Sequence, residues 1–178
     1  MGSSPPMQKL FDLILKVAPY DVNVCIDGES GTGKELVATQ MHLLSPRKSH
    51  PFITVNCGAI PDTLVESEFF GYEKGAFTGA VYRKQGKFEL AHKGTLFLDE
   101  IADLSPHAQA ALLRVIQQGE IITLGGQKHI PVDVRILCAS NQNLEKLVQE
   151  GRFRVDLYFR LSTIVINISP LRERVSDI

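Results

Sequence analysis

A glycine-rich stretch, GESGTGKE, occupies residues 28–35 of the 178-residue chain. Its glycines allow a tight turn in which several backbone N–H groups point inward, and a helix starting at its end would add positive potential. Lys34 would then reach the β- and γ-phosphates of a nucleotide as a point charge. This spacing predicts a phosphate-binding loop, which we favour over a glycine turn that merely caps a helix. The predicted nucleotide-binding residues are Gly28, Glu29, Ser30, Gly31, Thr32, Gly33, Lys34 and Glu35.

The residue after the lysine departs from the general form of this motif. It is normally Ser or Thr, whose hydroxyl coordinates Mg²⁺, whereas here it is Glu35. A carboxylate beside a triphosphate is repulsive unless it points away or holds the metal through water. On the loop alone, the motif therefore predicts a metal less strongly than it predicts a nucleotide.

Two carboxylates end the apolar stretch GTLFLDE, residues 94–100. In an open parallel sheet, ligands gather at the carboxyl ends of the strands, so Asp99 is placed to hold Mg²⁺ directly or through water. Glu100 is placed to polarise the water that attacks the γ-phosphate. Together with the glycine loop, the pair predicts phosphoryl transfer, which needs little beyond positioning and charge neutralisation. The alternative is a pair of solvated acids at a strand end.

Asn141 and the arginines of residues 152–161 are further candidates for this site, and the sequence leaves two interpretations open for each. Asn141 ends another apolar strand, expected beside the Asp99–Glu100 strand, where its amide would orient the attacking water or contact the γ-phosphate. A plain strand-end turn residue is equally compatible with the spacing. The segment RFRVDLYFRL, residues 152–161, holds three arginines that form either a solvated face or an arginine finger.

A glycine-rich connector, residues 71–89, contains Phe77 with little core-forming periodicity around it. Aromatic residues flanked by glycines in loops are often contact points for a partner. This interpretation is favoured over a buried Phe that pins the loop.

Alternating helices and apolar strands must position these residues. Helices are expected at 7–18, 35–44, 62–70, 106–118 with Ser105 as N-cap, and 143–151, and strands at 22–26, 52–56, 94–100, 133–141 and 162–168. In the second helix, Leu36, Val37, Met41 and Leu44 are assigned to one apolar face. Gly125–Gly126 predicts a hairpin turn. The pattern indicates an α/β fold, a mainly parallel five-stranded sheet covered by helices on both faces.

Composition excludes several other classes of protein. Hydrophobic residues make up 44% and charged residues 22% of the chain, as in an ordinary globular domain. A net charge of −1 gives no basic field for nucleic-acid binding, and no apolar run approaches a membrane span. Cys25, Cys57 and Cys138 are widely spaced, so core residues in a reducing cytosol are favoured over a chemical role.

Four motifs, GESGTGKE, GAFTGA (75–80), GTLFLDE and FRVDLYFRL, occur in the order found in one family. The chain closely resembles the central AAA+ domain of sigma-54-dependent transcriptional activators, the bacterial enhancer-binding proteins. The resemblance runs over residues 1–178 and implies an ATPase that uses ATP and Mg²⁺ to remodel sigma-54 RNA polymerase. It also implies a cytoplasmic protein that assembles into a hexameric or heptameric ring, with DNA bound only through another domain.

The resemblance also implies a role for each matching residue. Glu35 is the family's usual residue after the lysine, and Asn56 matches an asparagine that restrains the catalytic glutamate. Asn141 matches the first sensor residue, although ASNQNL differs from the usual ATNRDL. Arg154 and Arg160 match arginines offered to a neighbouring subunit. The loop that touches sigma-54 corresponds to Gly75, Ala76, Phe77, Thr78, Gly79 and Ala80, with Phe77 and Thr78 at its tip.

In the family, a helical lid follows the PLRER segment, and this sequence ends at Ile178 before any such lid. We therefore expect a truncated α/β subdomain, without receiver or helix-turn-helix domain, that hydrolyses ATP weakly or not at all by itself. Two other functions remain: a different AAA+ remodelling ATPase, against which GAFTGA argues, and a non-hydrolysing module that presents the loop to sigma-54.

Overall fold

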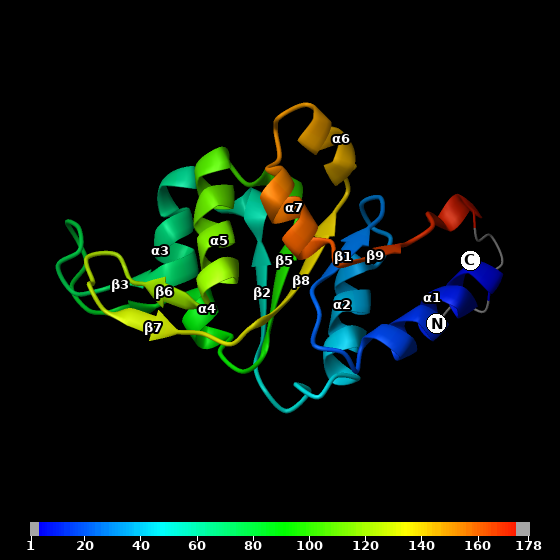
Figure 1. Ribbon diagram of the computed structural model, residues 1–178, viewed down its shortest axis with the longest axis horizontal. Coiled ribbons are helices and arrows are strands. Elements are labelled where there is room, and N and C mark those ends of the chain that lie inside the picture. Colours follow the sequence, from blue (N-terminus) through cyan, green and yellow to red (C-terminus); the bar gives the residue numbers. More distant parts are fainter. Residues whose placement is uncertain (1–3, 174–178) are drawn as a thin grey trace.

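The computed structural model describes residues 4–173, which fold around a five-stranded sheet (Figure 1). The strands are β1 (Val24–Asp27), β2 (Phe52–Asn56), β5 (Thr95–Asp99), β8 (Arg135–Ser140) and β9 (Ile164–Asn167). They lie in the order β2-β5-β8-β1-β9, and each neighbouring pair is parallel. The predicted α/β fold and its five strands are confirmed.

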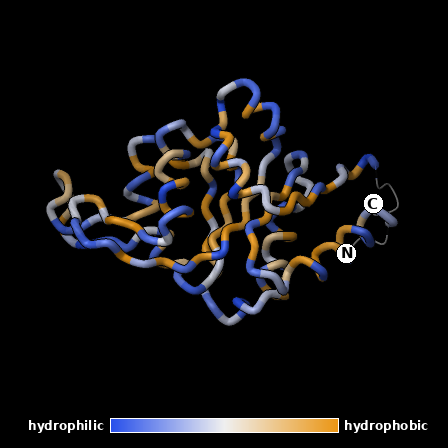
Figure 2. Tube along the Cα trace, viewed as in Figure 1, coloured by the Kyte–Doolittle hydropathy of each residue, from blue (hydrophilic) through white to orange (hydrophobic). Residues whose placement is uncertain are grey.

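Helices cover both faces of this sheet, because the strand residues alternate between two apolar clusters. On one face lie α1 (Pro5–Val17) and α2 (Lys34–Leu43), which pack against Val24 and Ile26 of β1. On the other lie α3 (Val65–Phe70), α4 (Lys87–Leu90), α5 (Pro106–Gln118), α6 (Leu144–Gln149) and α7 (Val155–Leu161). Hydrophobic residues accordingly concentrate along the central strands (Figure 2).

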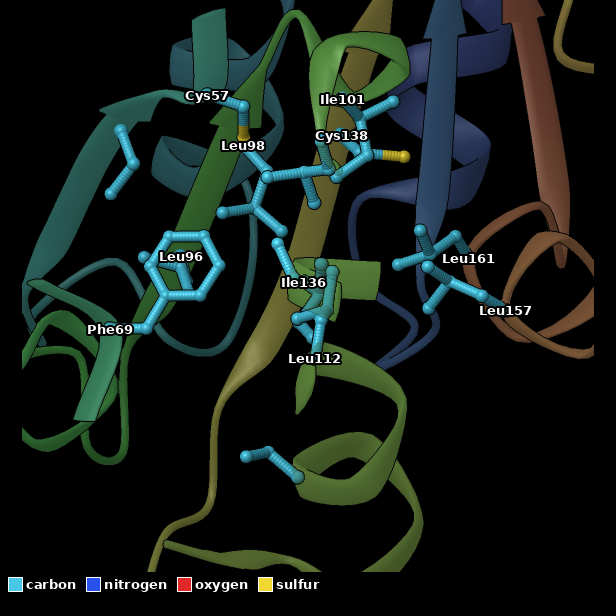
Figure 3. Packing of buried hydrophobic residues seen from close by; sticks show 14 of the residues in the cluster. Cys57, Phe69, Leu96, Leu98, Ile101, Leu112, Ile136, Cys138, Leu157 and Leu161 are labelled. Carbon is cyan, nitrogen blue, oxygen red and sulfur yellow. The ribbon is translucent and has the colours of Figure 1, made fainter. Parts of the chain in front are cut away.

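The larger cluster fills the space between β5, β8 and the helices of the second face. Leu96, Leu98 and Ile136 project from the strands toward Phe69 and Leu112 (Figure 3). Each is buried, so truncating one would cost several kcal/mol, roughly 2–5 for a leucine. The three cysteines are buried and free, which confirms their prediction as core residues.

The helix signals read from the sequence are present at the expected places. Ser105 Oγ accepts the N–H of Ala108 at the start of α5, which ends at Gly119 in the left-handed conformation. Gly71 ends α3 with φ 75°, and a Cβ there would lie 2.2 Å from the carbonyl oxygen of Lys84. No other residue type fits that position without moving the backbone.

The predicted apolar face of α2 is wrong in part. Val37 and Met41 are buried, but Leu36 is 72% exposed and Leu44 lies exposed at the C-cap. The buried face of α2 is centred near Met41. Successive residues of a helix lie about 100° apart around its axis, so Leu36 points about 100° away from the buried Val37 and still further from Met41.

Two small antiparallel ribbons extend from one side of the sheet (Figure 1). One pairs β3 (Gly71–Tyr72) with β4 (Lys84–Gln85), and the other pairs β6 (Glu120–Ile122) with β7 (His129–Pro131). The second contains the predicted Gly125–Gly126 turn, with Gly125 at φ 72°. Short 3₁₀ helices complete the fold: η1 (Cys57–Ala59), η2 (Asp62–Leu64), η3 (Ile101–Asp103) and η4 (Leu171–Glu173). Within residues 4–173, none of the helices is long and apolar enough to cross a membrane.

A single arginine ties together the loops at the amino ends of the strands. Arg47 donates to both carboxylate oxygens of Asp21, at 2.9 and 2.6 Å, and to Asp133 Oδ1 at 2.6 Å. It also donates to the carbonyl oxygens of Gly94 and Asp133. Its hydrogen bond, with a second from Lys93, lowers the pKa of Asp133 to about 2.

Arg47→Met should lower the free energy of unfolding by about 2 kcal/mol at pH 7, the scale of hydrogen bonds to charged groups. Both carboxylates are half exposed, so screening keeps the loss below that of a buried pair. Because the pKa of Asp133 is depressed, its contribution is present above the ordinary value of 3.8 and is lost as the pH falls toward 2. Urea unfolding from pH 7 to pH 2 should show wild type and variant converging in that interval. Lys48→Met is the control, and equal effects of the two substitutions at pH 7 would contradict this role of Arg47.

Candidate nucleotide-binding site

The carboxyl ends of the strands bring the predicted site residues to one edge of the sheet. β1 and β8 pair in register up to Asp27 and Ser140, and β2 and β5 up to Asn56 and Asp99. β8 also pairs with β5, so Asn141 follows a strand directly beside that of Asp99, as predicted. The glycine loop, the two acids and both asparagines therefore share this edge.

The glycine loop joins β1 to α2 in a strongly turned conformation. Gly31 has φ 78° and Gly33, the N-cap of α2, has φ 95°. Gly28 donates its N–H to the carbonyl oxygen of Ser140 at 3.2 Å, and a Cβ on it would lie 2.9 Å from Thr32 Oγ1. These glycines allow the backbone to curl against the N-terminus of α2, where the helix dipole favours an anion.

Lys34 lies against the loop it follows. Lys34 is only 8% exposed, and its Nζ donates to the carbonyl oxygens of Gly28 at 2.7 Å and Glu29 at 3.0 Å. Glu35, in contrast, is exposed in the first turn of α2. A carboxylate at that position is favoured by the helix dipole, and its exposure removes the electrostatic objection raised by the sequence.

Asp27 belongs to this region although no motif pointed to it. It is the last residue of β1, and burial raises the pKa of its carboxyl, while a hydrogen bond from Gly28 and the charge of Lys34 act in the opposite direction. The available signal was its position between the apolar strand and the first glycine.

Asp99 is the last residue of β5, and Glu100 begins the turn that follows it. Glu100 has φ 53°, in the left-handed region that non-glycine residues rarely adopt, and its N–H donates to Asp99 Oδ1 at 3.0 Å. Residues held in such conformations concentrate at functional sites. A Cβ on Gly58 would lie 2.9 Å from both Glu100 Oε2 and Asp103 Oδ2, so both carboxylates lie close to this glycine and a larger residue would make them shift.

Three acids gather around the buried thiol of Cys57. Burial, followed by the charges of Asp99, Asp103 and Glu100, raises the pKa of Cys57 to about 12. The thiol is therefore neutral at physiological pH and unsuited to nucleophilic attack. The negative charge at this edge of the sheet is therefore carried by Asp99, Glu100 and Asp103 and not by the thiol.

The two asparagines differ in how they are held. Asn56 Oδ1 accepts the N–H of Ala59 at 3.1 Å and so caps η1. Over residues 4–173, no hydrogen bond joins Asn56 to Glu100, although both side chains approach Gly58. Asn141 is exposed at the end of β8. The restraint that the family resemblance implies for Asn56 stays a prediction.

Both predicted arginines are exposed, Arg154 at the N-cap of α7 and Arg160 in its last turn. Arg154 is the exposed N-cap and forms a bidentate pair with Asp156, at 3.0 and 2.7 Å, which raises the pKa of its guanidinium further. Arg160 is exposed in the last turn. Neither makes an ion pair with Asp99 or Glu100 in the part of the chain that the structure describes.

The 75–80 loop is closed by its own backbone. Gly75 donates its N–H to the carbonyl oxygen of Ala80 at 2.8 Å, and Ala80 donates to that of Phe77. Phe77 is 46% exposed and packs edge-on against Tyr72, with ring centroids 4.9 Å apart. Ala80 is only 6% exposed, so its prediction as a partner contact conflicts with its burial.

The site residues fit a nucleotide and its magnesium ion. An apolar groove of about 200 Å³ lies between α1 and α2 beside Thr32 and Gly33. The planar base of a nucleotide would lie in this groove if its phosphates were bound by the glycine loop. Another cavity, about 380 Å³, lies between α3, α5 and β6, away from this edge, whereas one of about 330 Å³ is lined by Asp27 and Ser140 at the edge itself. Among residues 4–173, no group of three or more His, Cys, Asp or Glu could hold a metal by itself. Asp99 would therefore share Mg²⁺ with phosphate oxygens and water.

Comparison with known proteins gives consistent results. The family model of the sigma-54 interaction domain matches residues 1–167. The Nif-specific regulatory proteins of Azotobacter vinelandii and Azospirillum brasilense are 54% and 56% identical to this chain over 100% and 99% of its length. The chain covers only 34% and 28% of those two proteins, about a third of their length.

Solved structures agree with the sequence relatives. NtrX from Brucella abortus is 41% identical over 99% of this chain and 40% of that one, with a TM-score of 0.94. It has also been solved in complex with ATP and with ADP, with TM-scores of 0.93 and 0.92. A P-loop NTPase domain from E. coli, 19% identical over 96% of this chain and 99% of its own with a TM-score of 0.64, supports the fold alone.

Proposed function

The chain belongs to the sigma-54 interaction domain family, and from this premise we propose that it is the ATP-hydrolysing core of a sigma-54-dependent transcription activator. The observation that carries the proposal is the shared edge of the sheet, where Lys34, Asp99 and Glu100 follow β1 and β5. A related NtrX structure contains ATP, which supports the choice of nucleotide.

Each residue at this edge has a distinct task in the proposed reaction. The loop N–H groups and Lys34 bind and neutralise the triphosphate, and Asp99 holds Mg²⁺, which would draw negative charge from the phosphate oxygens. Glu100 accepts a proton from the attacking water, and its position beside Gly58 supports this role. Asn141 orients the water, and Asn56 controls the position of Glu100.

The exposed loop and α7 extend the proposal to partners. Phe77 and Thr78 contact sigma-54, and hydrolysis moves the loop that carries them. Arg154 and Arg160 reach the γ-phosphate of an adjacent subunit in a ring, which is consistent with their exposure on one short helix. The full-length protein would then open promoters bound by sigma-54 RNA polymerase.

Phe77→Ala or Thr78→Ala should abolish ATP-dependent binding to sigma-54 and leave ATP turnover within about twofold of wild type. The loop is distant in sequence from the glycine loop and shares no strand end with it, so removing an exposed contact should spare the chemistry. Phosphate release and sigma-54 co-sedimentation, both with full-length protein, measure the two effects. Tyr82→Ala removes another exposed aromatic as the control. Unchanged sigma-54 binding by both loop variants would exclude this contact.

A further inference from the structure

Gln109 of α5 is a buried amide with unusually complete bonding. The residue is 1% exposed. Its Nε2 donates to the carbonyl oxygens of Leu104 at 2.9 Å and Arg152 at 3.1 Å, and its Oε1 accepts the N–H of Arg154 at 2.9 Å. Both amide hydrogens are used, together with the oxygen, so the side chain has one defined orientation.

These bonds join two segments that are 40 to 50 residues apart in sequence. Leu104 ends the turn that begins at Glu100 and runs through η3. Arg152 and Arg154 lead into α7, of which Arg154 is the N-cap. Gln109 therefore connects the backbone of the acid turn to the backbone that carries both proposed arginines.

The neighbouring contacts make this connection stiff. Leu104 and Phe153 are buried, and the N–H groups of Arg152 and Phe153 both donate to the carbonyl oxygen of Leu147. The side chain of Arg154, the N-cap of α7, caps no backbone N–H of the helix. The Gln109 oxygen instead fixes the N–H of Arg154, at the residue where α7 begins.

We propose that Gln109 is a positioning residue that sets the Arg154–Arg160 helix relative to the Glu100 turn. The inference rests on the proposed function, because it assumes that the arginines serve a neighbouring subunit. Displacement of the acid turn in one subunit is passed through this amide to α7, and from there to the adjacent nucleotide site. The hydrogen-bond partners of the Gln109 amide are backbone groups of Leu104, Arg152 and Arg154, so it acts through the helix that carries the arginines.

Gln109→Leu in the full-length protein should lower kcat for ATP hydrolysis by roughly 10²-fold, the scale expected when a reacting group is displaced by about 1 Å. The Kd for ATP should stay within about twofold, because the glycine loop is untouched. Gln117→Leu makes the same change at an exposed position of α5 and should alter neither quantity.

Mixing subunits separates positioning in trans from damage to the subunit's own site. Lys34→Ala subunits cannot bind nucleotide but still offer correctly placed arginines. Mixed with Gln109→Leu subunits, they should raise the rate of ATP hydrolysis at least tenfold above that of Gln109→Leu alone. Mixed with Arg160→Ala, Gln109→Leu should restore none, because both partners then offer defective arginines. Absence of rescue with Lys34→Ala would overturn the inference.

A reference mixture distinguishes this failure from failure of the proposed function. Arg160→Ala with Lys34→Ala tests the trans arginine itself. If that mixture is active while Gln109→Leu with Lys34→Ala is not, Gln109 acts within its own site and the positioning role is wrong. If both are inactive, the trans arginine is wrong, and the inference that rests on it falls too. Should Gln109→Leu fail to fold, Gln109→Met, which is closer to glutamine in length and also lacks both donors and the acceptor, takes its place with the same expected pattern.

Discussion

Arg160→Ala subunits mixed with Lys34→Ala subunits should hydrolyse ATP, although each variant alone is expected to be inactive. The first keeps an intact glycine loop, and the second still presents its arginine to the neighbour. An arginine supplied in trans contributes about 10³–10⁵ in rate, so Arg160→Ala alone should lose turnover on that scale. Phosphate release by the full-length protein at several subunit ratios measures the rescue, which should peak at intermediate ratios.

The matched control is Arg152→Ala, because Arg152 is exposed on the same segment and pairs with Glu150 of its own chain. It should retain turnover. Size-exclusion chromatography must show that the mixed variants assemble, and an assembled mixture with no activity at any ratio would rule out delivery of Arg160 to a neighbour.

Glu100→Gln should retain ATP while its hydrolysis falls by about 10²–10⁴-fold, the contribution of one positioned base. The substitution keeps the size of the side chain and removes its negative charge and with it the ability to accept a proton, and the backbone of the left-handed turn at Glu100 is unchanged. Lys34→Ala should instead abolish ATP binding, because it removes the charge that offsets the triphosphate. Calorimetric ATP binding and single-turnover hydrolysis separate the two effects.

Glu66→Gln, remote from the sheet edge on α3, is the control for the change from carboxylate to amide and should leave both measurements unaltered. Turnover near the wild-type rate in Glu100→Gln would show that another group activates the water. Asp103 would then be the first alternative, since its carboxylate approaches Gly58 equally closely.

Local patterns in the sequence were sufficient to predict the five strands of the main sheet and the edge at which the proposed site residues gather. Apolar runs that end in Asn56, in Asp99 and beside Asn141 place polar residues at one edge once the sheet is taken as parallel, and the structure adds Asp27 to them. Helix ends followed from Ser105, Pro106 and Gly71, whose effects on the backbone act within a few residues. The predicted buried face of α2 was wrong at Leu36. In a helix of ten residues, the apolar positions are compatible with more than one choice of buried face.

Residues that act across the fold gave no such pattern. Arg47 and Gln109 are ordinary polar residues in a loop and a helix, and their importance depends on backbone groups 40 to 90 positions away. The available signal was the helical spacing of Gln109 with the inward-facing Leu112 and Ile116, since an amide on an apolar helix face needs partners. Its partners, however, are backbone groups, which carry no residue-type signature.

The position of β1 between β8 and β9 determines when the nucleotide loop can form during synthesis. Both strand partners of β1 lie more than a hundred residues later in the chain. At ribosomal rates that interval lasts on the order of 10 s, while Val24 and Ile26 have no sheet to join. Closing such long loops is also slow in refolding, because the entropy is lost before the contacts form. The loop that starts at Gly28 therefore gains its shape only after the ribosome has passed about residue 140, and until then the nascent chain offers apolar strand residues to chaperones rather than a binding site to ATP.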